Sequence, residues 1–209
     1  MRRPLLAALA AATLVLVTST QAQQAAPLKV WLMLPATGTF AALGDMIERG
    51  FKLYVDEQGG KLAGRTIQYV KVDDESEPSK ATDNVNKLIK RDNVDVIVGT
   101  VHSGVALAMA RAAKDSGTLL IVPNAGADAV TGPQCASNIF RSSFSNWQPG
   151  YATGVIAAQK GYKRAMTITW NYAAGNETVK GFTEAFEKGG GTVMKELSLP
   201  VPGVEFHRC

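Results

Sequence analysis

The sequence contains few of the residues on which metal binding and nucleophilic catalysis depend. Its 209 residues include only two cysteines and two histidines. The adjacent carboxylates Asp73 and Asp74 suggest a metal site or an acid–base pair, but no histidine stands near them at ligand spacing. We therefore interpret them as part of a solvated loop, and we expect no metal and no cofactor.

Nucleotide-binding motifs are also absent. No G-x-x-x-x-G-K-[ST] segment occurs, and neither "GDMIERG" nor "GGKLAG" is a G-x-G-x-x-G fingerprint that follows a strand. The net charge is only +4, and basic residues are mixed with acidic ones, whereas a nucleic-acid surface needs basic residues clustered on one face. We expect no nucleic-acid partner.

The two cysteines stand far apart in the sequence, at Cys135 and Cys209. Two cysteines in an exported chain can pair. Cys209 is the last residue of the chain, which argues against such a pair. The pairing of Cys135 stays open at this point.

The first 22 residues have the order of a secretory signal peptide. Arg2 and Arg3 precede an apolar run from Leu5 to Val17, and small and polar residues follow up to Ala22. The apolar run is too short to span a bilayer comfortably. We expect export and cleavage after Ala22; an uncleaved anchor or a buried helix is the alternative.

Strand and helix patterns alternate over residues 28–138. Strands are expected in "LKVWLMLP", "RTIQYVKVDD", "VDVIVGT" and "TLLIVPN", and amphipathic helices in residues 39–60, 78–92 and 104–117. Parallel strands need crossovers that themselves bury one face, so the pattern predicts an α/β fold with a doubly wound parallel sheet. Ligands of such sheets bind beyond the carboxyl ends of the strands.

A second α/β series occupies residues 139–209. A crossing strand is expected in "NIFRSSFS", a helix interrupted near Pro149 follows it, and the strands "RAMTITW" and "TVMKELSLP" enclose a further helix. A doubly wound unit needs more strands than these to cover its helices. We therefore expect an incomplete second lobe in a truncated or frameshifted chain, which as given would bind a ligand only weakly.

Five stretches carry a resemblance to a known family by their order and spacing. They are "KVWLMLPATGTFAALGDMIERGFKLYVDEQGG", "DDESEPSKATDNVNKLI", "VIVGTVHSGVALAMA", "LLIVPNAGADAVTG" and "NIFRSSFSNWQPG". Together they resemble the type I periplasmic substrate-binding proteins of ABC importers, in particular the branched-chain amino acid (Leu/Ile/Val) binding group. The resemblance covers residues 28–205, and complete members of the family are much longer.

This resemblance implies a two-lobed clamp that closes on a small carboxylate, with residues 28–138 as the first lobe. It implies a periplasmic protein that is not an enzyme, that is a monomer when complete, and whose partners are the membrane permease subunits of an ABC importer. Three alternatives stay open: a ligand-sensing receptor domain, a secreted enzyme, and an inactive truncated gene product.

The stretch "VGTVHSGVA" places polar groups where a strand gives way to a helix. The hydroxyl of Ser103 and the backbone N–H of Gly104 stand at the expected helix start, where the helix dipole favours an anion. By resemblance, this serine binds the ligand carboxylate through its hydroxyl. The alternative is that Ser103 only caps its own helix.

His102, beside Ser103, does not indicate hydrolysis. Residues adjacent in sequence rarely oppose each other in a catalytic triad, and no G-x-S-x-G elbow surrounds the pair. In the family that the chain resembles, the position of His102 often carries a cysteine paired to one near Ser76. That disulfide is absent from this sequence.

A second candidate binding loop follows the strand "TLLIVP" and contains Asn124, Ala125 and Gly126. It is either a ligand loop or simply a turn, since Asn and Gly both favour turns. Amino-acid binders of the family often have a threonine at the place of Gly126, whose hydroxyl helps to hold the ligand ammonium. They often have tyrosines at the places of Leu43 and Ala174.

Aromatic residues offer a different pocket chemistry. Trp170 and Tyr172 follow a strand end, where a ring can stack on a ligand ring. Phe144, Trp147 and Gln148 lie at the expected crossing between lobes. All of these could instead be half-buried core or lobe-interface residues. Because the expected ammonium partners are missing and rings are present, we predict a carboxylate without an α-ammonium, such as an aromatic acid.

Overall fold

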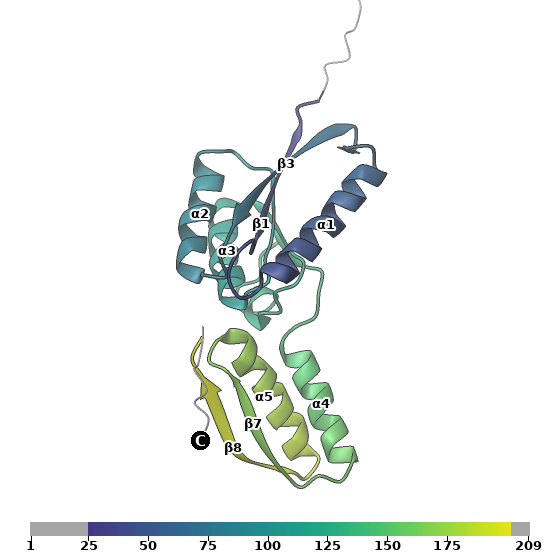
Figure 1. Ribbon diagram of the computed structural model, residues 1–209, viewed down its shortest axis with the longest axis vertical. Coiled ribbons are helices and arrows are strands. Elements are labelled where there is room, and N and C mark those ends of the chain that lie inside the picture. Colours follow the sequence, from purple (N-terminus) through teal and green to yellow (C-terminus); the bar gives the residue numbers. More distant parts are fainter. Residues whose placement is uncertain (1–24, 202–209) are drawn as a thin grey trace, which may run out of the picture.

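The computed structural model describes residues 25–201, which form two α/β lobes joined by one segment (Figure 1). The predicted signal peptide, residues 1–22, and Cys209 lie outside the described residues. Cys135 is exposed. Among the helices within residues 25–201, none has both the length and the apolar character needed to cross a membrane.

The first lobe is built on a six-stranded sheet of order β2-β3-β1-β4-β5-β6. All neighbouring strands are parallel except the short β2, which pairs antiparallel with β3. The strands are β1 Leu28–Leu34, β2 Lys61–Leu62, β3 Arg65–Asp73, β4 Val96–Val98, β5 Leu119–Val122 and β6 Ile139–Arg141. The predicted parallel sheet is therefore present, and its carboxyl edge faces the second lobe (Figure 1).

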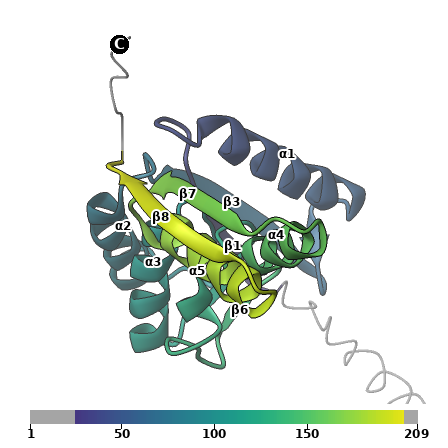
Figure 2. The same ribbon diagram turned by 90° about the horizontal axis from the view of Figure 1, so that it is seen from below.

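Helices cover both faces of this sheet. They are α1 Ala41–Glu57, α2 Pro78–Lys90 and α3 Ser103–Ser116. Figure 2 shows α1 on one side of the sheet and α2 and α3 on the other. Side chains alternate along β1: Leu32 packs with the α1 residues Ile47 and Phe51, whereas Met33 packs in the larger core below α2 and α3. A strand buried on both faces explains why β1 reads as a continuous apolar run.

The crossing strand completes the first sheet. Residues 139–141 pair in parallel with β5, with Ile139 opposite Leu120. These residues thus belong to the six-stranded sheet, three positions beyond the boundary expected after residue 138. The expected domain bounds, residues 28–138 and 139–209, stay a prediction.

The second lobe contains a two-stranded parallel sheet and two helices. They are α4 Trp147–Gln159, β7 Arg164–Trp170, α5 Ala173–Lys188 and β8 Thr192–Leu199. Pro149 does not interrupt α4, contrary to expectation, because it lies in the first turn, where a missing N–H breaks no helical hydrogen bond. In Figure 1 both helices lie on the same side of the sheet.

Glycines let α4 and α5 approach each other closely. A Cβ added to Gly150 would lie 2.0 Å from the carbonyl oxygen of Thr178, and one added to Gly181 would lie 2.4 Å from that of Trp147. Two helices can approach this closely only where no side chain lies between their backbones. The close packing of α4 against α5 therefore depends on glycine at these two positions.

Candidate binding cleft between the lobes

A cavity of about 370 Å³ lies where the carboxyl edge of the first sheet meets the second lobe. It is lined from the first lobe by Gly38, Thr39, Glu75, Ser76, Glu77, Pro78 and His102, and from the second by Asn171, Tyr172 and Val201. Of the residues that sequence analysis singled out for ligand binding, Tyr172 lines this cavity. The others lie outside its lining, and most of them lie around it.

His102 caps α3. Its Nδ1 accepts hydrogen bonds from the backbone N–H groups of Gly104 and Val105, at 3.0 and 3.3 Å. The expectation that Ser103 could be the cap is therefore wrong: His102 is the N-cap, and Ser103 is the first helical residue. Histidine is not among the usual capping residues, and a serine next to it is. Sequence reasoning accordingly chose the wrong neighbour.

The cap fixes the chemistry of the imidazole. Since Nδ1 accepts two hydrogen bonds, the ring proton is on Nε2. Burial lowers the pKa of His102, and only a weaker interaction with Glu77 opposes this. The ring is therefore a neutral group that presents an N–H donor.

Three rings from both lobes meet at this cap. The His102 ring centroid lies 5.9 Å from that of Phe40 and 4.8 Å from that of Tyr172. Tyr172 precedes α5, so its ring crosses from the second lobe to the first. Burial raises the pKa of its phenol, which keeps the hydroxyl protonated at neutral pH. The arrangement gives one wall of the cleft an aromatic surface.

Ser103 lies just behind this wall. Only 1% of its surface is exposed, and its Oγ accepts a hydrogen bond of 3.0 Å from Nδ2 of Asn146. The backbone N–H of Gly104, expected to face an anion, is instead bonded to His102. The serine hydroxyl thus remains available as a donor, while part of the expected backbone anion site is already occupied.

Asn146, which precedes α4, links the lobes and was not predicted. It is 6% exposed; its backbone N–H donates to the Gly126 carbonyl at 2.8 Å, and its Nδ2 donates to Ser103 and, at 2.8 Å, to Glu177. A Cβ on Gly126 would stand 2.4 Å from Oδ1 of Asn146. A side chain at position 126 would therefore collide with the Asn146 side chain, which fills the adjacent space.

Glu177 of α5 brings a carboxylate to the same place. Its Oε2 accepts from the backbone N–H of Asp128 in the first lobe, at 3.1 Å, as well as from Asn146. Burial raises its pKa, although these hydrogen bonds act in the opposite direction. No local pattern could have revealed this group, because its contacts span 31 and 49 positions of sequence.

Hydrogen bonds hold the loop of Asn124, Ala125 and Gly126 to the first lobe and to the segment that follows β6. The backbone N–H of Ala125, which is buried, donates to the Thr100 carbonyl at 2.9 Å, and the Asn124 carbonyl accepts from Ser143 at 3.0 Å. These contacts fix the loop beside Ser103. Its role toward a ligand stays a prediction.

The remaining aromatic candidates lie farther from the cavity. Trp170 ends β7 and is 42% exposed, but it is not part of the cavity wall. Trp147 stacks on Tyr151 at 4.3 Å and donates from Nε1 to Glu184 at 3.0 Å, so it packs within the second lobe. Phe144 is exposed, and Gln148 accepts from the N–H of Ser145.

The solvated-loop interpretation of the two aspartates is wrong for Asp74. This residue is fully buried; it accepts hydrogen bonds from the Thr100 hydroxyl and from the N–H of Ser76. Burial raises its pKa. Asp73, by contrast, receives the Thr37 hydroxyl at 2.7 Å. The pair thus ties the loop after β1 and the loop after β4 to the carboxyl end of β3.

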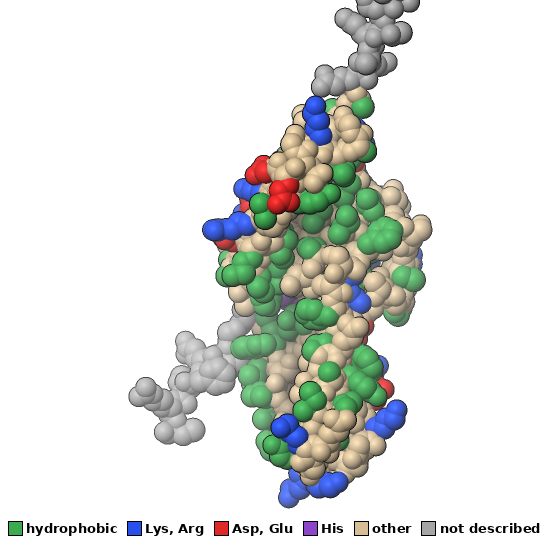
Figure 3. Space-filling model, turned by 90° about the vertical axis from the view of Figure 1, so that its right-hand side faces the viewer, with side chains coloured by type: hydrophobic (Ala, Val, Ile, Leu, Met, Phe, Trp, Pro, Cys, Tyr) green, Lys and Arg blue, Asp and Glu red, His purple; other side chains and the backbone are tan. Residues whose placement is uncertain are grey.

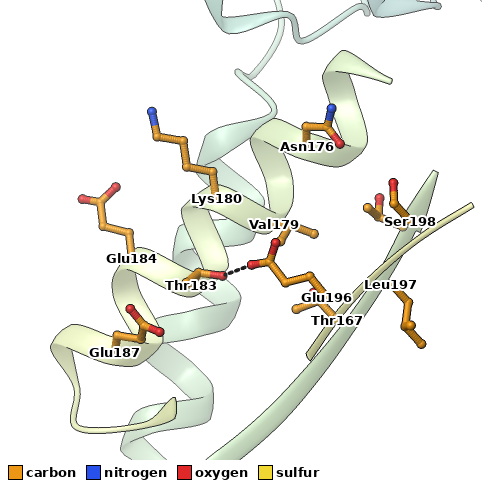
Figure 4. A pocket seen from close by; sticks show the side chains of 11 residues that line it. Thr167, Asn176, Val179, Lys180, Thr183, Glu184, Glu187, Glu196, Leu197 and Ser198 are labelled. Carbon is orange, nitrogen blue, oxygen red and sulfur yellow. Dashed lines mark hydrogen bonds between the residues drawn. The ribbon is translucent and has the colours of Figure 1, made fainter. Parts of the chain in front are cut away.

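A larger cavity of about 530 Å³ lies between α5 and the β7–β8 sheet (Figure 4). Its lining comes from the second lobe alone and includes Glu184, Glu187 and Glu196, with Lys180 as its one basic residue; Thr183 donates to Glu196 at 3.2 Å. An excess of carboxylates repels an anionic ligand. Residues 25–201 also contain no group of three or more His, Cys, Asp or Glu side chains arranged to hold a metal ion.

Two α/β lobes that enclose a cavity at the carboxyl ends of parallel strands define the two-lobed class of small-molecule binding proteins. The chain belongs to the periplasmic binding protein family, whose sequence pattern matches residues 27–208. Its fold is that of the type I members, and the predicted fold class is confirmed.

Relatives agree with this membership. The chain is 25% identical to Leu/Ile/Val-binding protein homolog 6 of Brucella abortus over 179 residues, which are 85% of this chain and 45% of that protein. It is similar to a solute-binding protein of an ABC transporter from R. palustris, solved in complex with benzoate: 54% identity, TM-score 0.83, 86% of this chain and 50% of that one. The leucine-binding protein LivK of Thermotoga maritima is 26% identical, with a TM-score of 0.77 over 86% of this chain and 51% of its own. The chain thus spans about half the length of these relatives.

Proposed function

We propose that the protein is an extracytoplasmic solute-binding protein that captures a small carboxylate in the cleft between its lobes and delivers it to an ABC importer. Its partners would then be the membrane permease subunits of that importer, and its location the periplasm. Capture and delivery require no chemical change in the ligand, so the proposal describes a binding protein rather than an enzyme.

The observation that carries this proposal is the ring pair across the cleft. Tyr172 of the second lobe contacts His102, the residue that caps α3, with ring centroids 4.8 Å apart and ring planes tilted by 34°, and Ser103 follows His102 in the chain. A flat ligand ring can pack against such an aromatic wall, and a hydroxyl donor at a helix start suits its carboxylate. The 54% identity to a benzoate-bound protein supports the same ligand class.

A second ligand class has its own support in Glu177. A carboxylate next to the cleft, together with the Asn146 Oδ1 beside Gly126, could pair with the α-ammonium of an amino acid. This observation acts against the expectation that the site offers nothing to an ammonium. Benzoate and leucine are therefore the two probes that separate an aromatic acid from an amino acid.

The test is a titration of the isotope-labelled mature chain followed by amide NMR, because a weak complex still shifts resonances. Benzoate is expected to move the amide signals of Gly104, Ala125 and Tyr172, whereas leucine, if preferred, would also move those of Asn146 and Glu177. A spectrum that neither probe changes at tens of millimolar would reject carboxylate capture. A shift confined to the polar cavity between α5 and the β7–β8 sheet would reject the cleft as its site.

The same titration tests the proposed role of Ser103. Replacement by alanine should weaken benzoate binding by about 1 to 3 kcal/mol, the cost of losing a hydrogen bond to a charged group. Circular dichroism verifies that the variant is folded. Unchanged affinity in a folded Ser103→Ala chain would leave Ser103 with a purely structural role.

A further inference from the structure

We propose that Asn146 is a positioning residue that fixes Ser103 as a hydrogen-bond donor and thereby makes the cleft select carboxylates over the corresponding amides. This inference rests on the proposed capture of a carboxylate through Ser103. It adds the reason for the selectivity, which depends on a residue 43 positions away.

Glu177 sets the orientation of the Asn146 amide. An ionised carboxylate can only accept hydrogen bonds, so the side of the Asn146 amide that faces Glu177 must be the nitrogen. The N–H of Asp128, which is also only a donor, shares the same Glu177 oxygen and holds the carboxylate in place. The orientation of the asparagine amide is therefore set by its partners.

The second step is the bond to Ser103. An amide nitrogen carries two hydrogens, and one of them points to Glu177 while the other points to the Ser103 Oγ, at 3.0 Å. Ser103 is thus an acceptor toward Asn146, and its own proton cannot be used in that contact. With only 1% of the residue exposed, water has little access to that proton.

The consequence is a fixed polarity at the ligand end. A serine hydroxyl has one proton and two acceptor sites and normally rotates to suit either kind of partner. Here the hydrogen bond from Asn146 biases the hydroxyl to donate to a partner other than Asn146, and under the proposed function that partner is the ligand carboxylate. Both oxygens of a carboxylate can accept that proton, whereas an amide has one acceptor oxygen and an NH2 group that would be left unpaired beside the Ser103 proton, at a cost in binding free energy.

Gly126 supports the same arrangement from the opposite side. A methyl group there would stand 2.4 Å from Oδ1 and 2.9 Å from Cγ of Asn146, too close for the amide to stay where it is. The Gly126→Ala variant therefore displaces Asn146 from Ser103 without changing any polar group.

The test compares benzoate with benzamide, two ligands of nearly equal shape, by the same NMR titration. In Asn146→Asp the new carboxyl group and Glu177 share one proton, and the oxygen that replaces Nδ2 accepts the Ser103 proton with its remaining lone pair, so the serine lone pairs face the ligand. We expect benzoate to bind at least tenfold more weakly and benzamide to bind more tightly than in the unmodified chain. In Gly126→Ala the hydroxyl is free to rotate, so the preference for benzoate should fall by a smaller factor.

Asn171→Asp is the matched control, because Asn171 lines the cavity and the change makes the same replacement without touching Ser103. It is expected to weaken benzoate by repulsion and to leave benzamide unimproved. If benzamide binds more tightly to Asn146→Asp but not to Asn171→Asp, neither the added charge nor a loss of structure explains the gain.

The outcomes separate the two proposals. If the unmodified chain shows no benzoate shifts, the proposed carboxylate capture fails, and this inference fails with it. If benzoate binds and both Asn146→Asp and Gly126→Ala keep the original ratio of the benzamide and benzoate dissociation constants, only the inference about Asn146 is overturned. Should Asn146→Asp not fold, Gly126→Ala decides the question by itself.

Discussion

The two lobes use the same βαβ unit but bury it differently. In β1 of the first lobe, Leu32, Met33 and Leu34 have no exposed surface, because helices cover both faces of the sheet. In β7 of the second lobe, helices cover one face, and Met166 and Ile168 are more than 60% exposed. In the view of Figure 3, hydrophobic side chains gather on the surfaces of both lobes, and charged ones lie mainly toward the ends and margins. The comparison teaches that covering layers, rather than strand sequence, decide how much a strand contributes to stability.

The sharpest test of this difference replaces one apolar residue in each sheet. Leu32→Ala should lower the free energy of unfolding by about 2 to 5 kcal/mol, since it leaves a cavity in a closed core. Ile168→Ala, at a side chain that is 64% exposed, should change it by less than about 0.5 kcal/mol. Urea unfolding followed by circular dichroism measures both. Equal losses would contradict the contrast between the lobes.

A second test concerns the helix pair on which the second lobe depends. Gly150→Ala should destabilise the protein by about 1 to 3 kcal/mol, because its methyl group would meet the Thr178 carbonyl and force the helices apart. Gly50→Ala in α1 is the matched control: nothing lies within 4 Å, so the change should stabilise that helix by about 0.5 to 1 kcal/mol. Thermal melts of the two variants should shift in opposite directions.

The cap of α3 predicts a dependence on pH. The folded protein holds His102 with a pKa below its ordinary value of 6.5. Between the two pKa values the unfolded chain binds more protons, so the contribution of His102 is complete above pH 6.5 and is lost as the pH falls through the lowered value. The capping bonds contribute about 0.5 to 2 kcal/mol. Melting temperatures of the native chain and of His102→Ala should therefore converge on acidification; a constant difference would argue against the neutral cap.

The smallest expected effect lies in the ring contact between the lobes. The His102–Tyr172 pair should contribute about 0.5 to 1.5 kcal/mol beyond burial. A double-mutant cycle of His102→Ala and Tyr172→Ala isolates this term as the departure from additivity. Purely additive losses would mean that the lobes do not stabilise each other through these rings.

Sequence reasoning succeeded where structure follows from local patterns. The apolar runs and helical periodicities of the first lobe predicted its strands, and Gly117, with a φ of 75°, ends α3 as expected. These features depend on residues within one or two turns of each other. They could be found without any knowledge of tertiary contacts.

It failed where function depends on distant partners. Asp74 was expected in a solvated loop before the helix at Pro78, yet Thr100 and the N–H of Ser76 satisfy it in the core. Gly126 suggested the loss of a hydroxyl, whereas an asparagine 20 positions later fills the adjacent space. Only the folded chain brings such groups together, so neither the capping role of His102 nor the placement of Asn146 could be read from composition or periodicity.

The Gly126–Asn146 backbone hydrogen bond marks a point about which one lobe could rotate relative to the other. Within residues 25–201 the chain passes between the lobes once, through the segment that ends at Asn146, and this 2.8 Å bond pins it to the first lobe. A rotation of the second lobe about that point would change the distance between Ser103 and Asn146 little. Tyr172, which lies farther from the point, would move more. Under the proposed function, the carboxylate end of a ligand would lie near the point that moves least, and the ring of Tyr172 would move farthest.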